Sequence, residues 1–153
     1  VRAVGVSNFN SGRFTDLAAH GKVLPAVNQV ETNVFSQQQQ AEALLRHFDT
    51  RIMAWAPLSQ GGEGLFDNEI LRATAERHNK TVAQVALRWL TQRGIIAIPK
   101  SERKERMQEN FDIFDFRLSD EEMLQIAALN RADTGTRDFD DPQFIKRLLS
   151  FTV

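Results

Sequence analysis

The chain of 153 residues has the length of one ordinary domain, and 42% hydrophobic with 25% charged residues is a globular composition. A net charge of −1 gives no electrostatic basis for binding nucleic acid or an anionic membrane, and the lack of cysteine excludes disulfides and a thiolate zinc site. No apolar run approaches the roughly 20 residues that span a bilayer, and no signal-peptide pattern opens the chain. We therefore expect a cytoplasmic protein with no membrane, nucleic-acid or metal partner.

The first half of the chain alternates short apolar runs with amphipathic segments. In chain order, the pattern predicts a strand at Val1–Val6, a helix at Ser11–His20, a strand at Ala26–Val30 and a helix at Gln37–Phe48. Gly21 is placed to end the first helix, and Ser36 is placed to cap the second. The chain begins without Met, directly in an apolar run, whereas a native N-terminus usually precedes its first core strand with a lead-in. We expect the chain to be a fragment.

The same alternation continues in the second half of the chain. In chain order, it predicts a strand at Arg51–Ala56, a loop from Ser59, helices at Asn68–Asn79 and Val82–Gln92, a strand at Ile95–Ile98, and helices at Arg103–Phe114 and Asp120–Asn130. Thr81 is a candidate N-cap, Gly94 a helix stop, and Ser119 with Glu122 forms a capping-box pattern. From Arg131 the tail is charged and irregular as far as Phe144–Phe151.

Four strand-plus-helix units in succession predict an α/β fold with parallel strands and crossover helices. Two architectures fit this order, an open doubly wound sheet and part of a (β/α)8 TIM barrel. No Gly-x-Gly-x-x-Gly sequence follows the first strand, so the nucleotide-binding fingerprint of the open sheet is missing. The pattern therefore favours the barrel.

Polar, aromatic and cationic residues follow the strands, where function collects in parallel α/β units. They are Ser7 and Asn8; Gln29; Trp55, Leu58 and Gln60; and Lys100, Ser101, Arg106, Glu109 and Asn110. Taken singly, Ser7 with Asn8, Gln29, and Lys100 with Arg106 are better explained as a turn or cap, a buried amide and a solvated helix start. Trp55 alone fits a plug of the barrel mouth and a functional role equally well. Together they suit a ligand with a flat ring and a phosphate. The ring, which carries a carboxamide, would stack on the indole, and the phosphate would bind at a helix start with a lysine and an arginine.

Three segments carry a resemblance to the aldo-keto reductase family. Gly5–Phe9 and Asn28–Glu31 resemble the segments whose Ser, Asn and Gln hold the nicotinamide carboxamide, and Ile98–Ser101 resembles the motif for the 2′-phosphate of NADP(H). The resemblance implies that NADPH or NADP+ is the cofactor. Its implied cofactor-binding residues are Ser7, Asn8, Gln29, Trp55, Leu58, Gln60, Ala83, Lys100, Ser101, Arg106, Glu109 and Asn110.

Within that set, the resemblance assigns Lys100, Ser101 and Arg106 to the 2′-phosphate, and Glu109 and Asn110, with Ala83 nearby, to adenine. Trp55 stands where the family often has a tyrosine that stacks on the nicotinamide. Trp in that place resembles the bacterial 2,5-diketo-D-gluconate reductase branch.

The resemblance covers residues 1 to about 130 and makes the chain the C-terminal half of one barrel domain, strands five to eight. The family's catalytic Asp, Tyr, Lys and His come from the other half, and this chain has no tyrosine. The resemblance implies that the whole protein reduces aldehydes or ketones with NADP(H). It also implies that this chain holds no catalytic residue and that the fragment alone is inactive. A cut barrel exposes two strand edges, so we expect a monomeric whole protein and self-association of the fragment.

Two other functions fit parts of the pattern. A non-catalytic NADP(H)-binding barrel subunit would keep the cofactor residues and lack the catalytic tyrosine in its other half. An unrelated phosphate-binding barrel enzyme would use Lys100 and Ser101 on a sugar phosphate, and would leave Ser7, Asn8, Gln29 and Trp55 unexplained.

Overall fold

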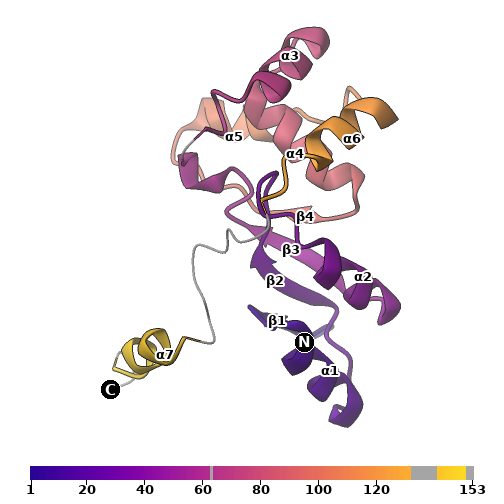
Figure 1. Cartoon of the computed structure of the whole chain (residues 1–153), viewed down its shortest axis with the longest axis vertical. Coiled ribbons are helices and arrows are strands. Elements are labelled where there is room, and N and C mark those ends of the chain that lie inside the picture. Colours follow the sequence, from indigo (N-terminus) through magenta and orange to yellow (C-terminus); the bar gives the residue numbers. More distant parts are fainter. Residues whose placement is uncertain (63, 132–140, 151–153) are drawn as a thin grey trace.

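Four parallel strands form one sheet in the computed structural model, which describes residues 1–62, 64–131 and 141–150. In sheet order they are β1 (Gly5–Ser7), β2 (Val27–Glu31), β3 (Arg51–Trp55) and β4 (Ile96–Ala97). The helices are α1 (Ser11–His20), α2 (Gln39–His47), α3 (Glu69–His78), α4 (Val82–Gln92), α5 (Lys104–Phe111), α6 (Asp120–Ala127) and α7 (Pro142–Leu149). Figure 1 shows α1 and α2 beside the lower strands and α3 to α6 grouped beyond β4. The order and the parallel α/β class predicted from the sequence are confirmed.

The strands are shorter than predicted, or displaced, because pairing sets their limits. β1 begins at Gly5 instead of Val1, since the segment before it makes only a single bond to the next strand, from Ala26 N to Val4 O. β3 ends one residue early because Ala56 turns to a left-handed φ of 50°. β4 keeps only its two central residues.

The prediction that Ser36 is the N-cap of α2 was wrong. The helix begins two residues later, after Gln38, which has a left-handed φ of 53° and makes no capping bond. Asn33 Oδ1 accepts from the backbone N–H of Ser36, which closes a turn ahead of the helix. Buried Gln37 donates through Nε2 to Ile126 O at 3.0 Å, so a tertiary contact holds this segment outside the helix.

The predicted capping residues of α4 and α6 are confirmed. Thr81 and Gln84 form a reciprocal capping box at the start of α4, and Ser119 and Glu122 form another at the start of α6. Gly94 follows α4 with φ 78°, a conformation that favours glycine. Both α5 and α6 end three residues before the predicted ends. The tail predicted as irregular falls mostly on residues 132–140, which lie outside the described residues, as does Phe151.

The two faces of the sheet differ in burial because side chains alternate along each strand. Ile52 and Ala54 are buried on the face that carries the helices. Their neighbours Met53 and Trp55, with Gln29 on β2, are only half-buried on the opposite face. In the described residues, β1 and β4 each pair with a single strand, so the sheet is an open arc with two free edges.

Helix α4 supplies the largest share of the core. Its buried residues are Ala83, Gln84, Val85, Ala86, Leu87, Trp89 and Leu90. Four of them, Val85, Ala86, Trp89 and Leu90, pack in one cluster with Ile52 and Ala54 of β3, Leu71 of α3 and Ile126 of α6. None of the described helices is long and apolar enough to cross a membrane.

A hydrogen-bonded contact between α3 and α6 joins these two helices. His78 Nε2 lies 3.0 Å from both carboxylate oxygens of Glu122, which is buried. Burial alone would raise the pKa of Glu122, but hydrogen bonds with His78 and with Ser119 outweigh it and hold the pKa below its ordinary 4.5. A depressed carboxyl pKa contributes stability above the unfolded-state pKa, and that contribution is lost as the pH falls through the folded-state value.

Replacing the carboxylate should therefore destabilise the fold at neutral pH. We expect Glu122→Gln to lower the free energy of unfolding by roughly 1–3 kcal/mol at pH 7, because a buried, hydrogen-bonded charge is lost. The difference should shrink as the pH falls through the lowered folded-state pKa of the wild-type carboxyl. Urea unfolding at pH 7 and at a series of lower pH values measures this. Glu121→Gln, one residue away on the exposed side, is the matched control; an equal loss in both variants would contradict the assignment.

Candidate functional site

A large cavity lies at the carboxyl ends of β3 and β4. Its volume is about 830 Å³, within the range of roughly 300–1,000 Å³ that small-molecule sites occupy. Its walls come from the loop after β3, the start of α4, the segment after β4 and one side of α5. The lining residues are Trp55, Ala56, Pro57, Leu58, Gln60, Gly61, Phe66, Thr81, Val82, Ala83, Ile98, Pro99, Lys100, Ser101, Arg106, Glu109 and Asn110.

Nine of the twelve predicted cofactor-binding residues line this cavity. They are Trp55, Leu58, Gln60, Ala83, Lys100, Ser101, Arg106, Glu109 and Asn110. They come from four separate segments, so proximity in sequence does not explain the gathering. An aromatic ring and a cationic cluster thus border one space, as the chemistry of a stacked ring and a phosphate requires.

The other three predicted residues, Ser7, Asn8 and Gln29, lie beside the cavity and do not line it. Asn8 Oδ1 accepts a hydrogen bond from the indole Nε1 of Trp55 at 2.9 Å. Ser7 Oγ donates to the backbone oxygen of Gln29 at 3.1 Å, and the Gln29 amide contacts Met53 Sδ. The three residues therefore form one polar group attached to the cavity through Trp55.

The backbone around the site is strained. Asn8, Ala56, Ser59 and Gln60 have left-handed φ angles between 50° and 56°, a region that costs non-glycine residues about 1–3 kcal/mol each. All four follow the carboxyl ends of β1 and β3. Strain of this kind persists where a binding geometry is imposed by the surrounding structure.

The loop after β3 also contains an unsatisfied hydroxyl. Ser59 Oγ is buried and has no hydrogen-bond partner among the described residues, and its neighbours Leu58 and Gln60 both line the cavity. Buried polar groups are almost always bonded in folded proteins, so a free one beside a cavity suits a ligand. The sequence places Ser59 in the loop after the strand but does not assign it to the site, since a serine in a turn gives no signal of burial.

The cationic end of the cavity is formed by the segment before α5. Lys100 Nζ lies 2.6 Å from Glu102, and both side chains are about four-fifths exposed, so this pair is weak. Ser101 Oγ accepts from Arg103 N at 3.2 Å, while the helix itself begins without a side-chain N-cap. Arg106 lies in the first turn. An uncapped helix start with two cations is an anion-binding arrangement.

The wall between α4 and α5 is held by hydrogen bonds that the sequence did not reveal. Thr81 Oγ1 donates to Glu109 Oε1 at 2.6 Å, and Gln84 Nε2 donates to Glu109 O at 3.2 Å. Thr81 was predicted only as a cap, yet it lines the cavity. Its second role depends on the distance between two helices, which the local pattern does not contain.

A second contact fixes the segment that follows α5. Lys80 Nζ pairs with Asp115 at 2.8 Å and with Asp112 at 3.1 Å. The hydrogen bond to Asp115 is the main reason why the pKa of Lys80 is raised, and the same bond lowers the pKa of Asp115. Among the described residues, no cluster of His, Asp and Glu has the arrangement of a metal site.

The chain belongs to the aldo/keto reductase family, whose sequence model matches residues 1–131. It is 45% identical over 130 residues to aldose reductase B of Dictyostelium discoideum, an alignment that covers 85% of this chain and 42% of the relative. It is 46% identical over 131 residues to glyoxal reductase of Bacillus subtilis, covering 86% of this chain and 47% of the relative. The chain thus spans about half the length of the curated relatives it matches.

Solved structures give the same result. An aldo-keto reductase from a Medee basin deep-sea metagenome library matches with a TM-score of 0.88 at 39% identity, covering 92% of this chain and 52% of that one. A Bombyx mori aldo-keto reductase solved in complex with NADP matches with a TM-score of 0.84 at 35% identity, covering 93% and 48%. The four-stranded arc therefore corresponds to part of a TIM barrel, as the sequence predicted.

The bond between Asn8 and Trp55 should control the mobility of the indole. We expect Asn8→Ala to increase acrylamide quenching of Trp55 fluorescence, because the indole loses the hydrogen bond from its Nε1 to Asn8. Trp89, the other tryptophan, is 1% exposed and contributes a constant background. The same substitution made in a Trp55→Phe variant is the control and should change nothing. Unchanged quenching in Asn8→Ala would mean that packing alone holds the ring.

Proposed function

We propose that this chain is the cofactor-binding half of an aldo-keto reductase barrel and that it binds NADPH or NADP+. The observation that carries the proposal is the single cavity that is lined both by Trp55, at the end of β3, and by Lys100 and Arg106, at the start of α5. A nicotinamide dinucleotide with a 2′-phosphate carries both matching groups, a flat ring and a phosphate. Relatives of known structure are described with NADP or NADPH.

In this proposal each end of the cavity has its own role. Trp55 stacks on the nicotinamide ring, with the indole edge fixed by Asn8, while Ser7 and Gln29 hold the carboxamide next to it. Leu58 and Gln60 bound the middle of the cavity. At the far end Lys100, Ser101 and Arg106 take the 2′-phosphate at the start of α5, and Glu109, Asn110 and Ala83 border the adenine.

The bound cofactor would supply a hydride to an aldehyde or ketone, and this chain would orient it. The chain has no tyrosine, so the proton for the carbonyl oxygen must come from elsewhere in the whole protein. We therefore propose a cytoplasmic carbonyl reductase as the complete protein, with no catalysis by residues 1–153 alone. The glyoxal and methylglyoxal reductases among the relatives, and Trp55 itself, favour small dicarbonyl or diketo-sugar acid substrates.

Cofactor selectivity tests the assignment of the phosphate end. We expect Arg106→Ala to weaken NADPH binding by ~1.5–3 kcal/mol, about 10- to 150-fold in Kd, because a charge-assisted contact to the 2′-phosphate is lost. NADH, which lacks that phosphate, should lose little. Calorimetric titration of both cofactors into the folded chain makes the comparison.

Arg103→Ala is the matched control, since Arg103 precedes the same helix and does not line the cavity. An equal loss for NADPH and NADH in Arg106→Ala would overturn the 2′-phosphate assignment. If the folded chain binds neither cofactor, addition of the N-terminal half of a relative's barrel separates an incomplete site from a wrong one.

The free strand edges make self-association part of the same proposal. Ile96 on β4 and the nearby Met107, Phe111 and Phe114 are large apolar residues with 41–76% exposure. We expect the chain to form dimers or larger species in a concentration-dependent way, because an unpaired edge beside an apolar surface favours association.

A charge on the edge strand should oppose that association. We expect Ile96→Lys to shift the population toward monomer in sedimentation velocity runs at matched concentration. Leu124→Lys, on α6 at 72% exposure, is the control and should leave the distribution unchanged. A wild-type chain that stays monomeric throughout would show that the edges do not drive association.

A further inference from the structure

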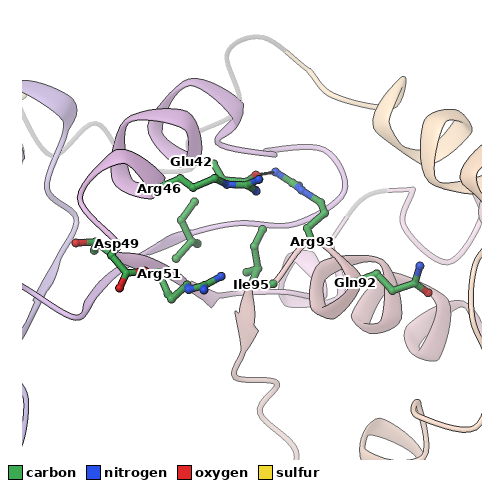
Figure 2. A pocket seen from close by; sticks show the side chains of 10 residues that line it. Glu42, Arg46, Asp49, Arg51, Gln92, Arg93 and Ile95 are labelled. Carbon is green, nitrogen blue, oxygen red and sulfur yellow. Dashed lines mark hydrogen bonds and ion pairs between the residues drawn. The ribbon is translucent and has the colours of Figure 1, made fainter.

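A second cavity lies at the opposite end of β3 from the cofactor cavity. It has a volume of about 340 Å³ and lies between the end of α2, the beginning of β3 and the turn after α4 (Figure 2). Trp55 ends β3 at the cofactor cavity, and Arg51 begins the strand at this one. The two cavities therefore share no lining residue, and this one is not explained by the proposed function.

The second cavity is rich in arginine. Arg46, Arg51 and Arg93 line it, against the carboxylates of Glu42 and Asp49. Glu42 is shared, since it pairs with Arg46 at 2.5 Å and also with Arg93. One carboxylate thus serves two guanidinium groups, and three positive charges face two negative ones.

Arg93 holds a buried donor that none of the described residues satisfies. Its Nη2 donates to Gln37 O at 2.8 Å and to Glu42, and its guanidinium lies over the Trp89 ring at 4.4 Å. Its Nη1 is buried and has no hydrogen-bond partner among the described residues. A guanidinium N–H withdrawn from water without an acceptor is costly, which calls for a bound acceptor.

Arg51 brings a second guanidinium group into the cavity, from the start of β3. Figure 2 shows Arg51 reaching in from β3 and Arg93 from the end of α4. A Cβ built on Gly94 would lie 3.3 Å from Arg51 Nη1, so the side chain crosses to the turn after α4. No acceptor for the Arg51 side chain is found among the described residues.

The helix ends around the cavity do not compete for these donors. Their last-turn carbonyls are already used, because Leu45 O accepts from Thr50 N and Leu90 O accepts from Ile95 N, both within 3.1 Å. Of the two carboxylates that line the cavity, Glu42 is paired with Arg46 and Arg93, and Asp49 is not part of these pairs. The free polar groups in the cavity are therefore mainly guanidinium N–H donors, whose forked geometry matches the oxygens of phosphate.

We propose that this cavity binds a phosphate group, as the free ion or as a phosphate monoester, through Arg51 and the Nη1 of Arg93. The site would join α2, β3 and α4 at the end of the sheet away from the cofactor. Occupancy would satisfy the buried donor of Arg93 and the exposed charge of Arg51 together. This proposal does not depend on the identity of the cofactor.

The test is calorimetric titration of inorganic phosphate, with ionic strength held constant by sodium chloride. We expect saturable binding by the wild-type chain and at least a tenfold weaker affinity in Arg51→Gln, which should fold normally because Arg51 is exposed and makes no side-chain hydrogen bond to the described residues. The matched control is Arg103→Gln, which removes an exposed arginine that lines neither cavity and should leave this binding in place. Arg106→Gln shows whether the cofactor cavity binds phosphate of its own. A parallel titration with glycerol 3-phosphate distinguishes a monoester site from one for the free ion.

Trp89 locates the bound anion, since its ring lies under Arg93. In a Trp55→Phe variant, Trp89 is the sole tryptophan, and phosphate should change its emission. The same titration of a Trp55→Phe variant that also carries Arg51→Gln should leave the emission unchanged. Absence of saturable binding by the wild-type chain would overturn the proposal. Binding that survives Arg51→Gln would overturn it as well. Binding that is lost only in Arg106→Gln would also overturn it and would place the anion in the cofactor cavity.

Discussion

The parallel pairing of β2 with β3 is the constraint on which the rest of the structure depends. Glu31 pairs with Trp55, and Asn28 with Ile52. Because side chains alternate along a strand, a slip of one residue would carry Ile52 out of the core and bury Trp55 under the helices. The register therefore decides at once what the core contains and what the cavity presents.

Helix α4 connects the two ends of the molecule. Its first turn, with Thr81 and Ala83, forms a wall of the cofactor cavity, and its last turn carries Arg93 into the arginine cavity. Between them the helix is buried along nearly its whole length. A rigid, capped and buried element of this kind can hold polar groups in place at both ends, since neither end is free to move without disturbing the core.

Much of the fold was open to prediction because periodicity and capping act locally. The limits of α1 and α4 came directly from their apolar spacing, and the capping boxes at Thr81 and Ser119 from single residues. The prediction of Ser36 as an N-cap was wrong for a physical reason. Ser36 lies in a turn that Asn33 closes, and the next residue, Gln37, bonds to α6, which is distant in the sequence. A cap pattern states what a residue can do locally, and tertiary contacts decide whether it does so.

The residues of the candidate site were predictable by their position after the strands, and the family membership that they indicated is confirmed. Their arrangement was not predictable. Asn8 had suggested a ligand contact, and the structure shows it bonded to the indole of Trp55.

The sequence by itself determined the strand-helix order, the family and the chemical types present, because these depend on neighbouring residues and on motifs. Only the tertiary structure decided which groups share a cavity, that Ser59 Oγ and Arg93 Nη1 are buried without partners among the described residues, and that Arg51 and Arg93 line the same cavity. Burial and partnership are properties of surfaces brought together from distant parts of the chain, and no local pattern encodes them.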